Sequence, residues 1–201
     1  MKTALLPICL MCAVGVSLCL ASEPNAIRNK LDHDSTIQGI PCARGDAWFY
    51  PNGALNQCTL SRSTKIGDVL APRHSVVEVW PNGAPHYLTI PRSAMVGGYR
   101  VMGSRAGSSS TVVSTFYSDG KLRSVYLVGD QTIEGVPCRG GSEWNLLAEP
   151  GNDSNYVEFF DDGTLESCRL AHEYGGHSSG QRFSRPRVAA AAETGKSQPA
   201  Q

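Results

Sequence analysis

Apolar and polar residues alternate in four stretches of the chain, and each stretch is centred on a pair of turn residues that ends in glycine. The pairs are Asn-Gly twice and then Asp-Gly twice, and their glycines are Gly53, Gly83, Gly120 and Gly163. Such a pair between two alternating segments is the strongest short-range signal for a β-hairpin. The pattern therefore predicts an all-β protein, an antiparallel meander of four β-hairpin repeats.

A two-residue turn at each glycine fixes which residues share a face of the predicted sheet. In the first repeat, Tyr50 would lie opposite Leu55 and Ala47 opposite Cys58. The same register gathers a mainly apolar set on one face of all four repeats: Ala47, Phe49, Cys58, Leu60, Val77, Val79, Leu88, Ile90, Ser114, Phe116, Val125, Leu127, Val157, Phe159, Cys168 and Leu170. The other face carries Thr59, Glu78, Thr89, Thr115, Ser124, Glu158 and Arg169. This alternation is typical of a sheet with one buried face.

Each predicted hairpin follows a connector segment. The first connector is Thr36–Cys42, the fourth is Thr132–Cys138, and shorter versions occur around Ile66-Gly67 and Val96-Gly97. We expect the four-unit repeat domain to span residues 36–174. Residues 22–35 are polar without a period and predict a flexible lead-in. Residues 175–201 are rich in Gly, Ser, Arg, Ala and Pro, which bury little apolar surface, so we expect a disordered tail.

The first 21 residues have the pattern of an export signal. Lys2 precedes an apolar run over residues 4–20, and small residues follow at Ala21 and Ser22. This order matches a charged region, an apolar region and a cleavage site. An uncleaved membrane anchor is the alternative, although the run is slightly shorter than the roughly 20 residues of a spanning helix. We expect a periplasmic or secreted protein with no stable membrane span after cleavage.

Four cysteines remain once the signal is removed, and an even number in an exported chain suggests disulfides. Cys42 and Cys138 end the first and fourth connectors, whereas Cys58 and Cys168 follow the turn glycines of the same repeats. The second and third repeats lack both members of the pair. Of the three possible connectivities this favours Cys42–Cys58 and Cys138–Cys168. Because Cys58 and Cys168 lie on the apolar face, the connectors are expected to cover that face.

An aromatic residue stands beside every predicted turn, on the second face. The candidate binding surface consists of Tyr50, Trp80, Tyr117 and Phe160. One interpretation is a cluster that fixes the turn ends. The other is an exposed stacking surface for a glycan or a protein partner, because aromatic side chains offer a large contact area at low entropic cost.

Other functional classes find little support in the sequence. Lys plus Arg and Asp plus Glu number 18 each, so no basic region indicates nucleic acid. The four cysteines outside the predicted signal form no Cys-x-x-Cys, and His172 and His177 are five residues apart, which fits no helical zinc motif. Arg44-Gly45-Asp46 fits a polar turn as well as an adhesion motif. No catalytic set stands out, so we expect a protein that is not an enzyme and has no cofactor or metal.

Two of the hairpins carry a resemblance to a known family. The segments Tyr50-Pro51-Asn52-Gly53-Ala54-Leu55 and Tyr117–Ser124 resemble the aromatic-x-Asn-Gly-x-Leu-x-Ser hairpins of bacterial MORN-like repeat proteins, including those labelled as YwqK-type antitoxins. The resemblance implies an elongated β-meander and a partner-binding role, and it transfers no site residue. We expect an exported binding or structural module. The alternatives are an immunity-type protein that binds a toxin and a hydrolase acting outside the cytoplasm.

Overall fold

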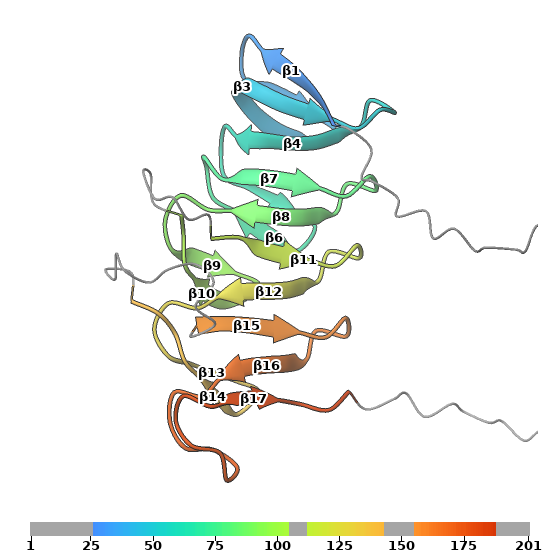
Figure 1. Ribbon diagram of the computed structural model, residues 1–201. Coiled ribbons are helices and arrows are strands. Elements are labelled where there is room, and N and C mark those ends of the chain that lie inside the picture. Colours follow the sequence, from blue (N-terminus) through green and yellow to red (C-terminus); the bar gives the residue numbers. More distant parts are fainter. Residues whose placement is uncertain (1–25, 105–111, 143–154, 188–201) are drawn as a thin grey trace, which may run out of the picture.

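The computed structural model describes residues 26–104, 112–142 and 155–187, and these residues form an all-β structure (Figure 1). The main sheet has 11 strands and is antiparallel. Its neighbouring strands are β1 (Ile27–Leu31), β3 (Ile40–Phe49), β4 (Leu55–Leu60), β7 (Val76–Val79), β8 (Pro85–Thr89), β11 (Ser114–Phe116), β12 (Leu122–Tyr126), β15 (Tyr156–Phe159), β16 (Leu165–Arg169) and β17 (Arg182–Ser184). The predicted all-β meander is confirmed.

The connectors are themselves small β-hairpins. In the first unit β2 (Ser35–Ile37) pairs with the beginning of β3. The other connector hairpins are β5 (Thr64–Ile66) with β6 (Val69–Ala71), β9 (Ala94–Val96) with β10 (Tyr99–Val101), and β13 (Gln131–Ile133) with β14 (Val136–Cys138). Figure 1 shows them behind one face of the main sheet. Each repeat unit is thus a connector hairpin followed by a main hairpin.

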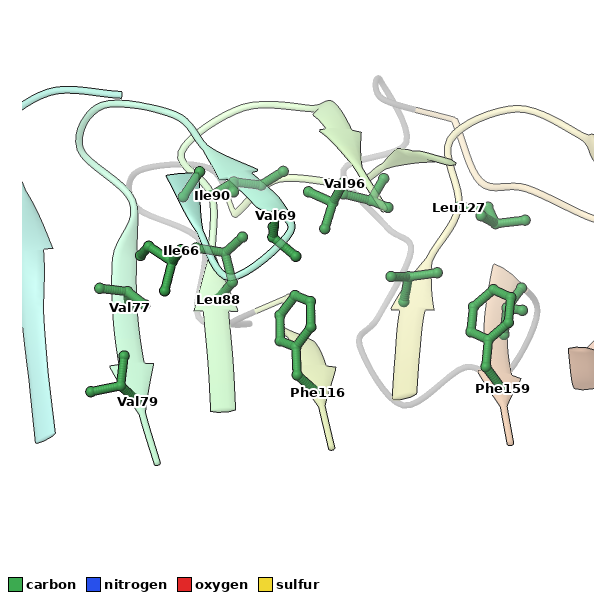
Figure 2. Packing of buried hydrophobic residues seen from close by; sticks show 14 of the residues in the cluster. Ile66, Val69, Val77, Val79, Leu88, Ile90, Val96, Phe116, Leu127 and Phe159 are labelled. Carbon is green, nitrogen blue, oxygen red and sulfur yellow. The ribbon is translucent and has the colours of Figure 1, made fainter. Parts of the chain in front are cut away.

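The hydrophobic core lies between the connector hairpins and the covered face of the main sheet. Ile66, Val69 and Val96 point from the connector hairpins toward Leu88 and Phe116 of the main strands (Figure 2). All of these side chains are buried. The described part of the chain places no second layer on the other face, which we call the open face (Figure 1). The two faces therefore differ as the alternation predicts.

The turns of the main hairpins differ from the predicted two-residue type. The Tyr50 and Ala54 backbones pair directly, and Gly53 donates its N–H to the Tyr50 carbonyl over 2.8 Å. Gly53 has a φ of 81°, whereas Asn52 has no positive φ. This is a three-residue loop with a left-handed glycine rather than a type I′ turn. In all four loops, the side chain of the residue before the glycine accepts the N–H two residues later.

A β-bulge then shifts the register back. Trp48 pairs with Gln57 but Phe49 pairs with Leu55, so Asn56 is the extra residue. The same shift occurs in the other three main hairpins. The pairing of Ala47 with Cys58 is as predicted, but the pairing of Tyr50 with Leu55 is wrong. Leu55 belongs to the buried core, and Leu165, its equivalent in the fourth unit, does too.

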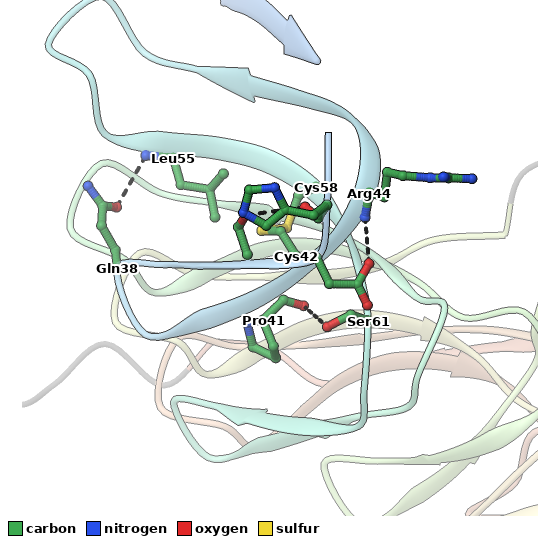
Figure 3. Close-up of a disulfide and its surroundings, with 10 residues drawn as sticks. Gln38, Pro41, Cys42, Arg44, Leu55, Cys58 and Ser61 are labelled. Carbon is green, nitrogen blue, oxygen red and sulfur yellow. Dashed lines mark hydrogen bonds between the residues drawn. A yellow bond between two sulfur atoms is a disulfide. The ribbon is translucent and has the colours of Figure 1, made fainter. Parts of the chain in front are cut away.

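Both predicted disulfides are present. Cys42 is bonded to Cys58, and Cys138 is bonded to Cys168, with 5.7 Å between the Cα atoms in each pair. All four cysteines are fully buried. Figure 3 shows the first bond joining the connector hairpin to the main hairpin beneath it. The bonds therefore fasten the two layers of the protein together in the first and fourth units.

Two segments expected to lack structure contain strands. Strand β1 lies within the expected flexible lead-in and pairs with β3 along five residues. Strand β17 lies within the expected disordered tail and pairs with β16. Both form long-range pairs that local composition does not reveal. Residues 1–21, the predicted signal, lie outside the described residues, and the described residues contain no helix long and apolar enough to span a membrane.

Candidate functional site

The four aromatic residues predicted as a binding surface do not form one exposed column. Tyr50 is only 8% exposed. Its hydroxyl donates to the Val79 carbonyl over 2.7 Å, and the Tyr117 hydroxyl donates to the Phe159 carbonyl over 2.8 Å. In each case a tyrosine of one main hairpin is fixed to the backbone of the next. Tyr50 and Tyr117 therefore help to hold neighbouring units together.

Trp80 belongs to a compact stack on the open face. The centroid of its ring lies 3.6 Å from that of His86, and the centroids of the His86 and Tyr87 rings are 3.8 Å apart. His86 is 7% exposed, and its Nδ1 lies 3.0 Å from Glu78 Oε1. The imidazole is enclosed between two rings and a carboxylate. A catalytic base must reach a substrate, and this burial favours a structural role for His86.

The remaining two aromatics line a shallow pocket of about 420 Å³ on the open face. Its other walls come from the third and fourth main hairpins and from the segment after β17. The lining residues are Tyr117, Arg123, Glu158, Phe160, Glu166, Arg185 and Arg187. Three guanidinium groups and two carboxylates thus surround two aromatic rings. We call this site the charged pocket.

Guanidinium groups cover the aromatic rings of the charged pocket. Arg123 lies over the ring of Tyr117 and Arg187 over the ring of Phe160, each with 5.7 Å to the ring centroid. Burial raises the pKa of the Tyr117 hydroxyl, and the nearby Glu166 carboxylate raises that pKa further. The hydroxyl therefore stays protonated at neutral pH and keeps its hydrogen bond to Phe159. The covered rings offer little flat surface for stacking a sugar.

Strand β17 and the residues after it are held to the fourth unit by three ion pairs. Arg182 pairs with Glu158, Arg185 with Glu134 over 2.6 Å, and Arg187 with Asp161 over 2.7 Å. Side-chain contact with Asp161 keeps the Arg187 pKa above its ordinary value. This segment forms one wall of the charged pocket. It was missed in the sequence because its composition indicates a disordered tail.

The bulge residues were also missed. Asn56, His86, Arg123 and Glu166 each follow their turn glycine by three positions. A polar residue that interrupts the alternation at the same place in every repeat could have revealed them. In the third and fourth units these residues are Arg123 and Glu166, so the bulges supply two of the charged groups in the pocket.

More aromatic side chains lie on the open face than the four beside the turns. Trp48 and Tyr87 occupy one row across the sheet, since both pair within the row that includes Gln57 and Glu78. Tyr126 and Tyr156 pair across β12 and β15, with ring centroids 4.9 Å apart. Tyr87 is 38% exposed and the other three are half-buried.

The second cavity, of about 300 Å³, lies where the connector turns meet the main turns. Its walls include Gly67, Gly97, Pro85 and Leu122. A Cβ at Gly97 would lie 3.1 Å from a methyl group of Leu122. The walls are largely backbone and apolar side chains, and the cavity marks the seam between the two layers.

Within the described residues, no group of three or more His, Cys, Asp or Glu side chains could hold a metal ion. No family model, curated protein or solved structure matches this chain.

Proposed function

We propose that this protein is an exported, non-enzymatic binding module that holds a protein partner against its open face. The proposal agrees with the resemblance of its hairpins to MORN-like repeats, some of which are labelled as antitoxins. It also agrees with the two disulfides, because such bonds persist in oxidising compartments outside the cytoplasm.

The observation that carries the proposal is the concentration of aromatic side chains on the open face. The face holds Trp48, Trp80, Tyr87, Tyr117, Tyr126, Tyr156 and Phe160. A solvent-facing side of an antiparallel sheet is ordinarily polar. Tyrosine, tryptophan and arginine are the residues enriched in protein interfaces, especially at energetically important positions.

A protein partner fits this face better than a glycan. Guanidinium groups lie over the rings of Trp48, Tyr117 and Phe160. The Trp80 and Tyr87 rings have His86 between them. A sugar would need an open ring face, whereas a protein surface can use ring edges, hydroxyl groups and the neighbouring charges.

The test compares substitutions on the two sides of the molecule. A variant with Trp48→Ser, Tyr87→Ser and Tyr156→Ser removes aromatics from the open face. The matched control carries Leu70→Ser and Met95→Ser, which remove the exposed apolar side chains of the connector hairpins, 63% and 57% exposed. Purified wild type and both variants would be immobilised and exposed to the extracellular and envelope fractions of the source organism.

We expect the wild type and the control to capture the same protein, and the aromatic variant to bind it at least about tenfold more weakly. The affinity would be measured with that purified protein. Urea unfolding of each variant would verify that it is folded. Equal affinity of the folded aromatic variant, or loss of binding in the control alone, would overturn the proposal. Capture of a polysaccharide in place of a protein would overturn it as well.

A further inference from the structure

The charged pocket contains two opposite charges that the described part of the chain leaves without an ion pair. Arg185, Arg187 and Glu158 are compensated by Glu134, Asp161 and Arg182, respectively. Arg123 instead lies over the Tyr117 ring, and Glu166 makes no side-chain hydrogen bond or ion pair among the described residues. The pocket therefore presents one cation and one anion that have no ion-pair partner among the described residues.

The two groups come from strands that are not neighbours in the sheet. Arg123 and Glu166 are the bulge residues of β12 and β16, and β15 lies between those strands. Neighbouring strands are about 4.8 Å apart, so the two backbones are separated by roughly 10 Å. Arg123 and Glu166 could form an ion pair across this spacing only if both side chains extended toward each other. Arg123 extends toward Tyr117 instead.

A ligand for this pocket needs both signs of charge. A simple anion attracted to Arg123 would be opposed by Glu166, and a simple cation attracted to Glu166 would be opposed by Arg123. In an extended peptide, residues i and i+2 project to the same side and are about 6.6 Å apart along the chain. Their side chains could reach Arg123 and Glu166 together.

We propose that the charged pocket binds an extended peptide segment of the partner in which an acidic and a basic residue are separated by one position. The acidic side chain contacts Arg123 and the basic side chain contacts Glu166. This inference rests on the proposed function, since it names the part of the partner that one site on the open face recognises.

The test uses short peptides rather than the partner. The probe is acetyl-Lys-Ala-Asp-amide, and the controls are acetyl-Lys-Ala-Asn-amide and acetyl-Gln-Ala-Asp-amide. Each would be titrated into the isotopically labelled full chain while amide chemical shifts are followed. We expect the probe to shift residues around the charged pocket and to bind about two- to fivefold more tightly than either control, the size expected for partly exposed ion pairs.

Substitutions in the pocket test which charge of the peptide each pocket residue recognises. Arg123→Gln should abolish the preference for Asp over Asn, and Glu166→Gln should abolish the preference for Lys over Gln. The double variant Arg123→Glu with Glu166→Arg should restore both preferences, because a free peptide can reverse its orientation. Arg62→Gln with Glu173→Gln removes two exposed charges elsewhere and should change nothing.

Preferences that survive both single substitutions, or shifts confined to residues outside the pocket, would overturn the inference. The proposed function has a separate readout. If Arg123→Gln with Glu166→Gln leaves partner affinity unchanged while the aromatic variant loses it, the inference about the pocket fails. Binding of the partner at the open face is then still supported. If the aromatic variant also keeps its affinity, the proposed function fails.

Discussion

Gln38 in the first connector turn accepts, through its Oε1, the backbone N–H of Leu55 over 3.1 Å. Glu134 does the same for Leu165 in the fourth unit, over 3.2 Å. The bulge beside each leucine interrupts the ladder there. In the second unit, Gly67 and Pro85 occupy these positions, so the acceptor side chain and the donor N–H are both missing. In the third unit Gly97 replaces the acceptor residue, whereas Leu122 keeps its N–H, so only the first and fourth units have both partners.

This pairing predicts a specific cost for Gln38→Ala. The Leu55 N–H is partly buried and would lose its acceptor, so the free energy of unfolding should fall by roughly 1 kcal/mol. Gln38→Glu keeps an oxygen in the same place and serves as the control. Urea unfolding would measure both. Equal stability of wild type and the alanine variant would contradict the prediction.

The second unit has buried apolar residues where the first has a disulfide, and this comparison predicts how far packing can replace the bond. Cys42 and Cys58 correspond to Ala71 and Leu88 in the second unit, which are buried in the core. Cys42→Ala with Cys58→Ala should reduce the unfolding free energy by about 3 kcal/mol, from the lost restriction on the unfolded chain. Cys42→Ala with Cys58→Leu copies the second unit and should recover part of this loss. Urea unfolding checks the order, and equal stability of the two variants would contradict it.

The turn type predicts the effect of Asn52→Gly. In a type I′ turn Asn52 would be left-handed, and glycine would be favoured there. Here Asn52 has no positive φ and its Oδ1 accepts the Ala54 N–H over 3.0 Å. Glycine should therefore destabilise the protein, by about 1 kcal/mol, because a hydrogen bond is lost and the unfolded chain gains freedom. A rise in the urea midpoint would indicate the two-residue turn instead.

Two of the turns predict a loss of stability in acid. The Lys121 backbone N–H lowers the pKa of Asp119, and the Thr164 hydroxyl lowers that of Asp162. A lowered folded-state pKa gives stability that is present above the unfolded value, about 3.9, and is lost as the pH falls through the folded value. The urea midpoint should therefore fall below about pH 4.

Substitutions isolate this contribution. Asp119→Asn with Asp162→Asn should make the acid decline shallower, because Asn52 and Asn82 make the same turn contact without a charge. Asn52→Asp with Asn82→Asp should make it steeper. Urea midpoints measured between about pH 5 and pH 3 would compare the three proteins. Identical profiles would exclude the turn aspartates as a source of acid sensitivity.

The alternation of residues was enough to predict the meander, the covered face and the pairing of Ala47 with Cys58. The predicted pairing is correct beyond the bulge because the turn and the bulge shift the register by one residue in opposite directions. The turn shortens the register by one residue, and the bulge at Asn56 restores it. Between the turn and the bulge the prediction fails, which is why Leu55 was assigned to the wrong face.

The charged pocket could not be predicted in the same way. Arg185 and Arg187 are fixed by Glu134 and Asp161, which are distant in sequence. Local composition contains no information about such partners. The four aromatics beside the turns were found, but their exposure depends on contacts with the next unit, as the bond from Tyr50 to Val79 illustrates. The family resemblance and the export signal stay predictions.

The two disulfides lie in the first and last units of the stack, and this position bears on how the protein would come apart. In a linear array, an inner unit has a neighbour on both sides, whereas a terminal unit has only one. Fraying should therefore begin at the ends. A covalent bond between the layers in each terminal unit opposes fraying where it would start, so the array should unfold as one cooperative block rather than unit by unit.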